Sequence, residues 1–300
     1  MNSLNASVKK LHGLFLSENS KKGIERGILV LSIISFIVHL AFIYLADVLP
    51  FLNAENSLLG SPVAAVYPPF SFILIYEVYL LVYYLPRSIT TYISKQYEII
   101  SLIIIRRLFK DLANLKLTTE WFSVKGDLQF TYDILASIIL FYLLFWFYRL
   151  NKNRKKIKNK ETGLSQGLHQ FVHLKKGIAL VLVPLLLGLV LYSFGSWSYA
   201  DFSGNLSYIQ QLKNVNNIFF DEFFSILIIV DVLLLLVLFF YTDQYHKVIR
   251  NSGFVISTIL IRISFSVEGL VNTILIVFAV VFGLIILWIH NQFEQQFEKS

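Results

Sequence analysis

The chain has 300 residues, of which 56% are hydrophobic and 15% are charged. Soluble domains are usually about half apolar and a quarter charged, so this composition indicates an integral membrane protein. Cysteine is absent, which excludes disulfides, thiolate metal sites and a cysteine nucleophile. The basic residues behind the net charge of +7 lie mostly between apolar segments. They therefore predict membrane topology and attraction to anionic lipid rather than nucleic-acid binding.

In chain order, six apolar runs are long enough to cross about 30 Å of hydrocarbon as helices. They fall near residues 27–47, 70–91, 130–149, 177–198, 222–242 and 271–290. Two further segments, near 93–113 and 249–269, are apolar in the middle but contain Arg106, Arg107 and Arg262. Hydropathy alone leaves open whether these two segments cross the membrane or form re-entrant or interfacial helices.

The placement of Lys and Arg favours crossing for both segments. The tail 1–26 and the linker 150–176 are rich in Lys and Arg, and the positive-inside rule places both in the cytoplasm. An even number of spans must then separate them, so the segment 93–113 has to cross. The same logic makes 249–269 a crossing. We therefore expect a multi-pass protein of the cytoplasmic (inner) membrane with eight spans and both termini in the cytoplasm.

The two halves of the chain resemble each other in order and spacing. KKGI occurs at 21–24 and at 175–178, AD at 46–47 and at 200–201, and ILIYEVYLL at 73–81 aligns with LIIVDVLLL at 227–235. All three matches share an offset of 154 residues and contain polar positions, which chance alignment of Ile and Leu strings does not explain. With four spans in each half, the repeats would be parallel, related by an axis along the membrane normal.

The expected fold is thus an all-α polytopic membrane protein built from two parallel four-helix repeats. The first repeat covers 27–149 and follows the cytoplasmic tail 1–26. The second repeat covers 177–300 and follows the basic cytoplasmic linker 150–176.

The alignment of the halves also places Glu77 opposite Asp231, and Arg106 opposite Arg262. In the predicted topology Glu77 and Arg106 both lie about 10 Å below the outer surface, on neighbouring spans. A charge in the bilayer interior costs at least about 2.5–3.5 kcal/mol, so such residues usually pair or line water. We expect one intramembrane carboxylate–arginine pair per repeat, Glu77–Arg106 and Asp231–Arg262. The pairs would either orient the helices or take part in moving an ion or sensing a field.

Two accessory residues lie close to the first predicted pair. Arg107 points roughly 100° away from Arg106 around the helix and has no counterpart in the second half, so we expect its side chain to reach the outer headgroups. Asp133 enters the span 130–149 near its outer end, where it is either solvated or joins the first pair.

The histidines predict no cofactor. His169 and His173 have the i, i+4 spacing of a helical metal pair, but no third ligand is evident near them in the sequence. A haem between two histidines needs them at similar depth on facing helices, whereas His39 and His290 differ in predicted depth. We expect neither a cofactor nor a bound metal.

Three functional hypotheses follow. The first is a small channel or transporter in which the charge pairs or the repeat interface provide a polar route. The second is a non-transport scaffold, assembly factor or sensor that acts through a membrane partner protein. An intramembrane lipid-modifying enzyme is third, because polar residues do not cluster at either predicted membrane interface. Common hydrolase and phosphate-loop motifs do not occur either, and we expect no enzymatic activity. The expected partners are the bilayer, anionic lipids at the linker 150–176, and either a second copy of the chain or another membrane protein, but no nucleic acid.

Overall fold

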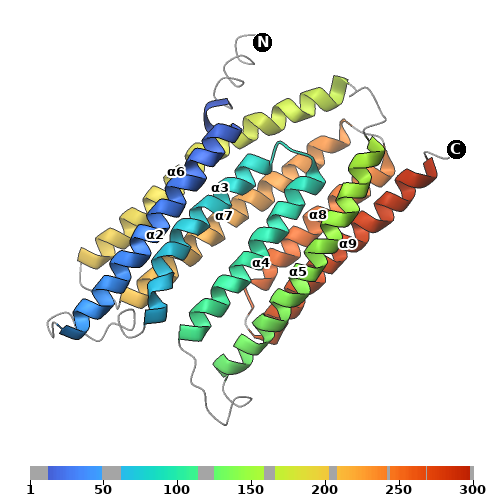
Figure 1. Ribbon diagram of the computed structural model, residues 1–300. Coiled ribbons are helices and arrows are strands. Elements are labelled where there is room, and N and C mark those ends of the chain that lie inside the picture. The colour runs from blue at the N-terminus through green and yellow to red at the C-terminus, as the bar shows by residue number, and fades with distance from the viewer. Residues whose placement is uncertain are drawn as a thin grey trace. The chain divides into compact units, whose positions relative to one another are not determined.

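The structure, a computed structural model, describes residues 13–48, 62–113, 125–158, 166–202, 208–241, 244–267 and 269–297. In these residues every regular element is a helix (Figure 1). The elements are α2 (Glu18–Val48), the 3-10 helix η2 (Pro62–Val66), α3 (Tyr67–Tyr84), α4 (Ile89–Ala113), α5 (Lys125–Lys158), α6 (Gln166–Phe202), α7 (Tyr208–Phe239), α8 (Tyr245–Ser264) and α9 (Leu270–Phe297). The described part of the chain confirms the all-α prediction and contains a helix in each of the eight predicted segments. α3 ends at Tyr84, however, seven residues before the end of the predicted run 70–91.

Five of the described helices contain a stretch that is long and apolar enough to cross a membrane. The stretches are Gly13–Leu45, Leu128–Lys152, Gln170–Tyr192, Glu222–Phe239 and Leu270–Gln296. A sixth apolar helix, Pro68–Tyr84, is shorter. These helices indicate a multi-pass membrane protein.

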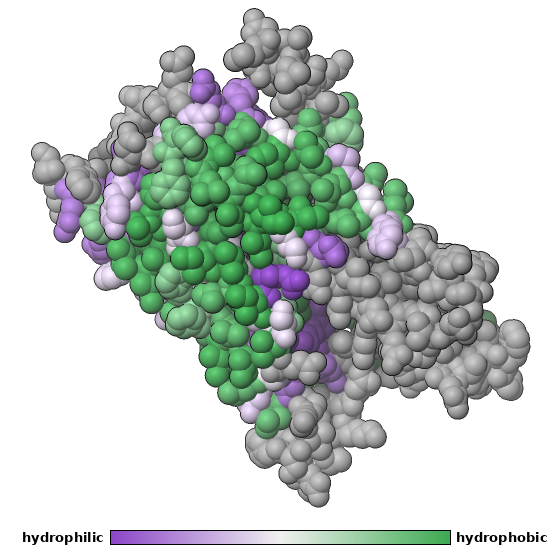
Figure 2. All heavy atoms as spheres, turned by 180° about the vertical axis from the view of Figure 1, so that it is seen from behind, coloured by the Kyte–Doolittle hydropathy of each residue, from purple (hydrophilic) through white to green (hydrophobic). Residues whose placement is uncertain are grey.

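The outer surface of the described helices is strongly apolar. On α5, the side chains of Ile138, Phe141, Tyr142 and Phe145 are each more than half exposed. Figure 2 shows a broad hydrophobic surface over the described residues. Contiguous apolar surface of this extent is a liability in water, but it is what a helix needs where it faces lipid.

Several helices extend beyond the predicted spans into polar sequence. α2 begins at Glu18, within the predicted tail, and α7 begins at Tyr208, well before the apolar run near 222–242. α5 continues to Lys158 and α6 begins at Gln166, so both ends of the predicted linker are helical. Hydropathy identifies the part of each helix that suits lipid, but Lys, Gln, Glu and Arg are also good helix formers, so the helix does not end where the apolar run ends.

The chain divides into two compact units. The first comprises Met1–Tyr83, Phe109–Asn114 and Lys176–Phe224, and the second comprises Tyr84–Leu108, Leu115–Lys175 and Ser225–Ser300. Each unit draws helices from both halves of the sequence, so the boundary between units differs from the predicted boundary between repeats. The two four-helix repeats stay a prediction.

In the first unit, a row of tyrosines packs α3 against α2. Tyr76, Tyr79 and Tyr83 lie on one face of α3 because they are spaced three and four residues apart. Tyr76 donates a hydrogen bond of 2.9 Å to Glu25, and Tyr83 donates one of 2.7 Å to Glu18. The later residue on α3 thus meets the earlier residue on α2, so these two helices run antiparallel.

In the second unit, α8 and α9 form a closely packed antiparallel hairpin. The turn between them contains Gly269 with a φ of 75°, a left-handed conformation that costs glycine little. A Cβ atom on Gly253 of α8 would lie 2.9 Å from the side chain of Ile286 of α9. A Cβ atom on Gly283 of α9 would lie only 1.8 Å from the hydroxyl of Tyr97. Both glycines therefore permit contacts that a larger residue would block.

Tyr97 of α4 anchors the centre of the second unit. Its hydroxyl lies 2.7 Å from Ser257 Oγ, which itself donates to the carbonyl of Ala279 at 2.6 Å, so Tyr97 is the donor to Ser257. Its ring packs edge-on against Phe147 of α5 at 5.2 Å, and Phe147 lies 6.0 Å from Phe254 of α8. All three aromatic side chains are fully buried, so they tie α4, α5 and α8 together.

Candidate functional site

Two clusters of buried polar residues lie along α4 in the second unit. One includes Tyr92 and Gln96, in the first two turns of α4, and the other includes Arg107, near its opposite end. The eleven residues from Gln96 to Arg107 separate the clusters by about 16 Å along the helix. The two clusters differ in how completely their polar atoms are hydrogen-bonded.

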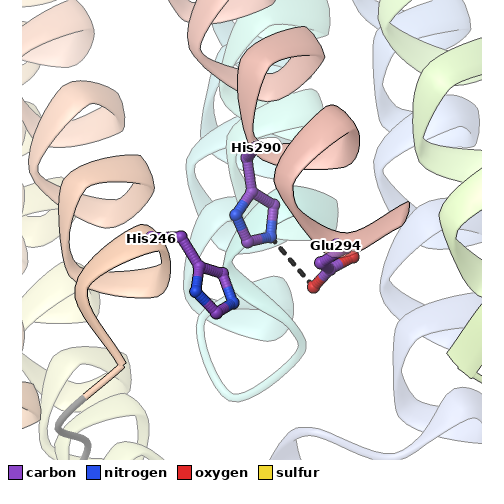
Figure 3. A group of neighbouring side chains, drawn as sticks. All are labelled: His246, His290 and Glu294. Carbon is purple, nitrogen blue, oxygen red and sulfur yellow. Dashed lines mark ion pairs between the residues drawn. The ribbon is translucent and has the colours of Figure 1, made fainter. Parts of the chain in front are cut away.

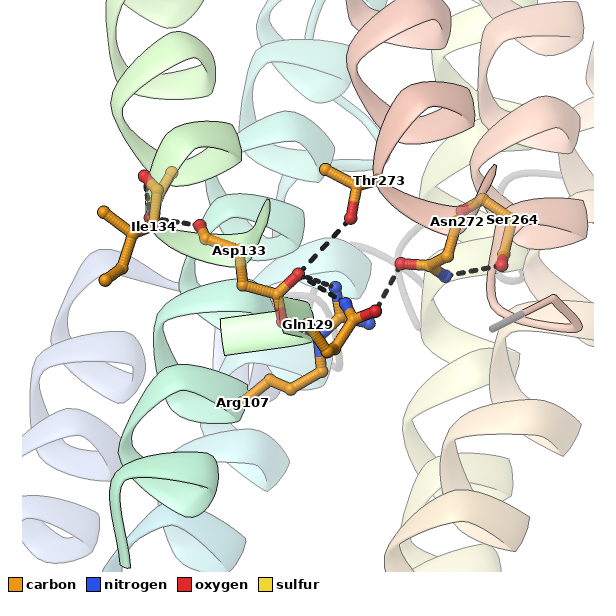
Figure 4. A network of polar contacts seen from close by, with 8 residues as sticks. Arg107, Gln129, Asp133, Ile134, Ser264, Asn272 and Thr273 are labelled. Atoms are coloured by element: carbon orange, nitrogen blue, oxygen red, sulfur yellow. Dashed lines mark hydrogen bonds and ion pairs between the residues drawn. The ribbon is translucent and has the colours of Figure 1, made fainter. Parts of the chain in front are cut away.

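The cluster at the end of α4 is fully connected (Figure 4), and we call it the saturated cluster. Arg107 binds Asp133 of α5 in a bidentate manner through Nε and Nη2 and donates its Nη1 to Asn272 of α9 at 2.9 Å. Asp133 also accepts hydrogen bonds from Gln129 at 2.8 Å and from Thr273 at 3.4 Å. The Asp133 side chain is 0% exposed and that of Arg107 is 27% exposed. The hydrogen bonds from Arg107, Gln129 and Thr273 therefore take the place of water around the buried carboxylate.

The saturated cluster is held in place by the helices that carry it. Gln129 and Asp133 lie one turn apart on α5 and thus share a face. The amide of Asn272 donates to the carbonyl of Ser264, at the end of α8, at 2.5 Å. That bond orients the Asn272 oxygen toward Arg107, and the network links α4, α5, α8 and α9.

This arrangement corrects two expectations from the sequence. Arg107 does not extend toward headgroups, because its guanidinium is engaged by Asp133 and Asn272. Asp133 is a buried member of an ion pair rather than a solvated carboxylate, and the arginine it binds is Arg107. Gln129, Asn272 and Thr273 were not anticipated, although the i, i+4 spacing of Gln129 and Asp133 was visible in the sequence.

The cluster at the start of α4 is only partly connected, and we call it the open cluster. Asp231 of α7 is 6% exposed and accepts a hydrogen bond of 3.2 Å from Gln96 Nε2. The Tyr92 hydroxyl also lies close enough to Asp231 to interact with it as a weak hydrogen-bond donor, but the geometry of that contact is poor. Within the described part of the chain, Tyr92 Oη and Gln96 Oε1 are buried and have no hydrogen-bond partner.

Lys175 of α6 supplies a buried positive charge to the open cluster. Its side chain is within electrostatic range of Asp231 and of Arg250 on α8. The ammonium group donates a hydrogen bond of 3.0 Å to the carbonyl of Arg87, in the turn between α3 and α4, and lies 5.7 Å from the centre of the Phe171 ring. The lysine therefore balances the charge of Asp231 while its hydrogen bond goes to the backbone.

The remaining predicted site residues are placed as follows. Glu77 is buried on α3 in the first unit, and Arg106 is half-buried on α4 in the second unit; their pairing stays a prediction. Arg262 lies in the last turn of α8, where a cation interacts favourably with the helix dipole. The described contacts of Asp231 are to α4 and α6, and its pairing with Arg262 also stays a prediction.

Chemically, the two clusters offer different capabilities. In the saturated cluster the carboxylate of Asp133 is paired with the guanidinium of Arg107, and their main donor and acceptor atoms are hydrogen-bonded. A buried ion pair of this kind can hold neighbouring helices in a fixed arrangement. The open cluster combines a buried carboxylate with two buried oxygen atoms that lack partners. Buried polar atoms are nearly always hydrogen-bonded, so such exceptions point to a bound water or ion or to a functional role.

Comparison of the chain with protein-family models, with curated proteins and with solved structures finds no match.

Proposed function

We propose that the chain is a small integral membrane channel or transporter for a proton or a monovalent cation, and that Asp231 is the group that the ion visits. The observation that carries the proposal is the open cluster. Asp231 provides a buried carboxylate, and the two α4 residues that contact it, Tyr92 and Gln96, each carry a buried oxygen without a well-formed hydrogen bond. Ionisable residues inside membrane segments commonly mark ion or proton pathways, and oxygen ligands are those by which proteins replace the hydration shell of a cation.

Each residue of the open cluster has a role in this proposal. Asp231 would take up the proton or cation, and the Tyr92 oxygen would join its coordination. The Gln96 amide presents Nε2 to Asp231 in this structure, so it would have to rotate to bring Oε1 to the ion. Lys175 would balance the charge of Asp231 when the site is empty, which reduces the cost of an ionised carboxylate in low dielectric. Asp231 lies eight residues from the end of α7, or about 12 Å along the helix, so an ion would have to enter the bundle to reach it.

The topology that accompanies this proposal is eight spans with both termini in the cytoplasm of an inner membrane. α4 has 25 residues and α8 has 20, and helices of that length reach about 30–37 Å, enough to cross the hydrocarbon. The basic tail and linker support the orientation. In that orientation the open cluster would face the cytoplasmic side and the saturated cluster the outer side.

The topology is tested with single cysteines in this cysteine-free chain. Ser266, exposed in the turn after α8, should react with a membrane-impermeant thiol reagent from outside once it is replaced by cysteine. Gln244 and Arg87, both exposed before α8 and α4, should react only after the membrane is opened. Labelling of positions 244 and 266 from the same side would show that α8 does not cross.

The transport proposal is tested by ion flux in reconstituted vesicles. Wild-type protein should carry protons or alkali cations under an imposed potential, and Asp231→Asn should reduce the flux to that of protein-free vesicles. Glu98→Gln is the matched control, because Glu98 lies on α4 two residues after Gln96 but binds the partly exposed Lys95 at 2.6 Å. Its flux should equal that of wild type, and equal loss in both variants would contradict a specific role for Asp231.

The alternative function is a non-transport membrane scaffold, assembly factor or sensor. The saturated cluster favours it, because a fully paired network needs no ligand to be stable. Wild-type vesicles without flux of protons or alkali cations at any imposed potential would remove the transport proposal and leave this alternative.

A further inference from the structure

A third polar cluster lies at the start of α8 and the end of α9, in the second unit (Figure 3). It consists of His246 of α8 and of His290 and Glu294 of α9, and one potential ligand atom from each lies within 4.8 Å of the others. His290 and Glu294 share a face of α9 because they are four residues apart. The antiparallel register of the hairpin brings His246 to that face, and the two imidazole rings lie 5.3 Å apart.

The neighbouring arginine reveals the protonation state of His290. Arg250 Nη1 lies 2.8 Å from His290 Nε2. A guanidinium group can only donate hydrogen bonds, so His290 Nε2 must accept and therefore carries a lone pair rather than a proton. The imidazole is neutral in this state, with its proton on Nδ1.

That assignment leaves two acceptor atoms facing each other. Glu294 Oε1 lies 3.0 Å from the same Nε2 of His290, and neither atom has a proton to share with the other. Two lone pairs at this distance repel unless an electrophile lies beside both. In a tetrahedral zinc site with bonds of about 2.0–2.1 Å, neighbouring ligand atoms are about 3.3 Å apart, so the observed spacing is close to that of two ligands of one ion.

We propose that His246, His290 and Glu294 bind a transition-metal dication such as Zn²⁺, and that Arg250 occupies the site in its absence. Two imidazoles and one carboxylate form a set that suits zinc and its neighbours rather than Ca²⁺ or Mg²⁺. His246 and Glu294 are partly exposed, which gives an ion access and leaves a fourth position for water. Arg250 would stay anchored when a metal displaces its Nη1 from His290, because its Nε and Nη2 donate to Asn251 at 3.0 and 2.9 Å.

The sequence alone predicted no metal here for a simple reason. His246 and His290 are far apart in the chain, and only the packing of α8 on α9 brings them together. The site also adjoins the open cluster, since Arg250 acts electrostatically on Lys175. Displacement of Arg250 by a metal would therefore change the charge environment of that cluster.

The experiment is a titration of the full-length protein, purified in detergent without a histidine tag, with Zn²⁺ and with Co²⁺. Wild type should bind one ion per chain, with a Co²⁺ visible spectrum of nitrogen–oxygen type and a rise in unfolding temperature on addition of Zn²⁺. His246→Ala and Glu294→Gln should each weaken binding by about tenfold or more, since even loss of an outer-shell partner costs about 10–100-fold. Arg250→Gln should strengthen binding by about tenfold or more, because it removes a competing positive charge at close range.

The control replaces His169 and His173 together by alanine, which removes the other closely spaced histidine pair. It should leave the affinity unchanged. Substitutions at the partly exposed positions 246 and 294 keep the test valid if replacement of the buried Arg250 or His290 impairs folding. The proposal is overturned if wild type shows no saturable binding of Zn²⁺ or Co²⁺, or if the His169 and His173 control abolishes binding while His246→Ala and Glu294→Gln do not.

Discussion

The saturated and open clusters share α4 and lie about 16 Å apart along it. Each contains a buried aspartate, but the two aspartates differ in how completely they are hydrogen-bonded. Asp133 is held by two nitrogens of Arg107, by Gln129 and by Thr273. Asp231 receives one well-formed hydrogen bond, from Gln96, and weaker interactions from Tyr92 and Lys175. A carboxylate whose oxygens already accept all their hydrogen bonds gains no stability from a bound ion. A carboxylate with few hydrogen bonds is stabilised when an ion binds to it. This difference is why we assign structure to one cluster and function to the other.

The largest effect is expected from breaking the saturated cluster. Asp133→Asn takes the carboxylate away from Arg107, whose side chain is 27% exposed. It should therefore lower the free energy of unfolding by about 2–3 kcal/mol, somewhat less than the roughly 3–5 kcal/mol of a fully buried pair. The double change Asp133→Asn with Arg107→Gln should cost less than the sum of the single changes, as measured by unfolding in detergent.

The matched change in the open cluster is Asp231→Asn. It removes a charge that has few partners, so it should cost much less stability than Asp133→Asn. Equal destabilisation by the two changes would break the comparison and make Asp231 a structural residue.

The second effect concerns the packing next to the open cluster. In Gly283→Ala the new methyl group would meet the Tyr97 hydroxyl at 1.8 Å and its Cζ at 3.0 Å. The ring must then shift within its buried packing, at a typical overpacking cost of about 1–3 kcal/mol. Thermal unfolding of Gly283→Ala, alone and combined with Tyr97→Phe, measures this cost. The combination should recover part of it, because the closest atom is gone; no recovery would place the strain elsewhere.

A smaller effect is expected at the exposed ion pair on α4. Lys95 and Glu98 are 24% and 32% exposed and lie 2.6 Å apart. Partly exposed pairs of this type contribute about 0.2–1 kcal/mol, so Glu98→Gln should change the unfolding free energy by no more than that. The difference from wild type should shrink as salt is raised. A salt-insensitive loss would show that the bond from Tyr148 to Glu98 matters more than the ion pair.

The smallest change in stability is expected from Tyr92→Phe. The Tyr92 hydroxyl has no hydrogen-bond partner among the described residues, so its removal should alter the unfolding free energy by about 0.5 kcal/mol or less, or even increase it. Vesicle flux should nevertheless fall, because an ion ligand is lost. Unchanged flux with increased stability would mean that the hydroxyl is a packing defect rather than part of a site.

Much of the fold was predictable because membrane insertion depends on local sequence. Segment length, hydropathy and the positions of Lys and Arg predicted a helix at each of the eight places where the structure has one. The helix ends were less predictable: α5 runs on to Lys158 and α6 starts at Gln166, because polar helix formers extend a helix beyond the lipid without changing its hydropathy signal.

The partners of the charged residues were harder to predict. Depth can be estimated by counting residues, but the choice between Arg106 and Arg107 depends on which face of α4 meets α5. That choice is made by tertiary contacts such as Arg107–Asn272, which join residues far apart in the sequence. Asp231 was predicted as a site residue, but its neighbours Tyr92, Gln96 and Lys175 were not. Gln96 and Asp231 lie on helices from different halves of the chain, so no sequence pattern indicated their contact.

The two glycines of the α8–α9 hairpin restrict how this part of the molecule can move. Gly253 receives Ile286, and Gly283 receives Tyr97, while Ser257 and Asn272 bind backbone carbonyls across the hairpin. Sliding of α8 past α9 by one helical turn, about 5.4 Å, would place a residue larger than Gly253 against Ile286 and would break both hydrogen bonds. Packed helices of this kind switch between discrete arrangements rather than deform continuously. Any conformational cycle of the second unit should therefore carry α8 and α9 together as one rigid body.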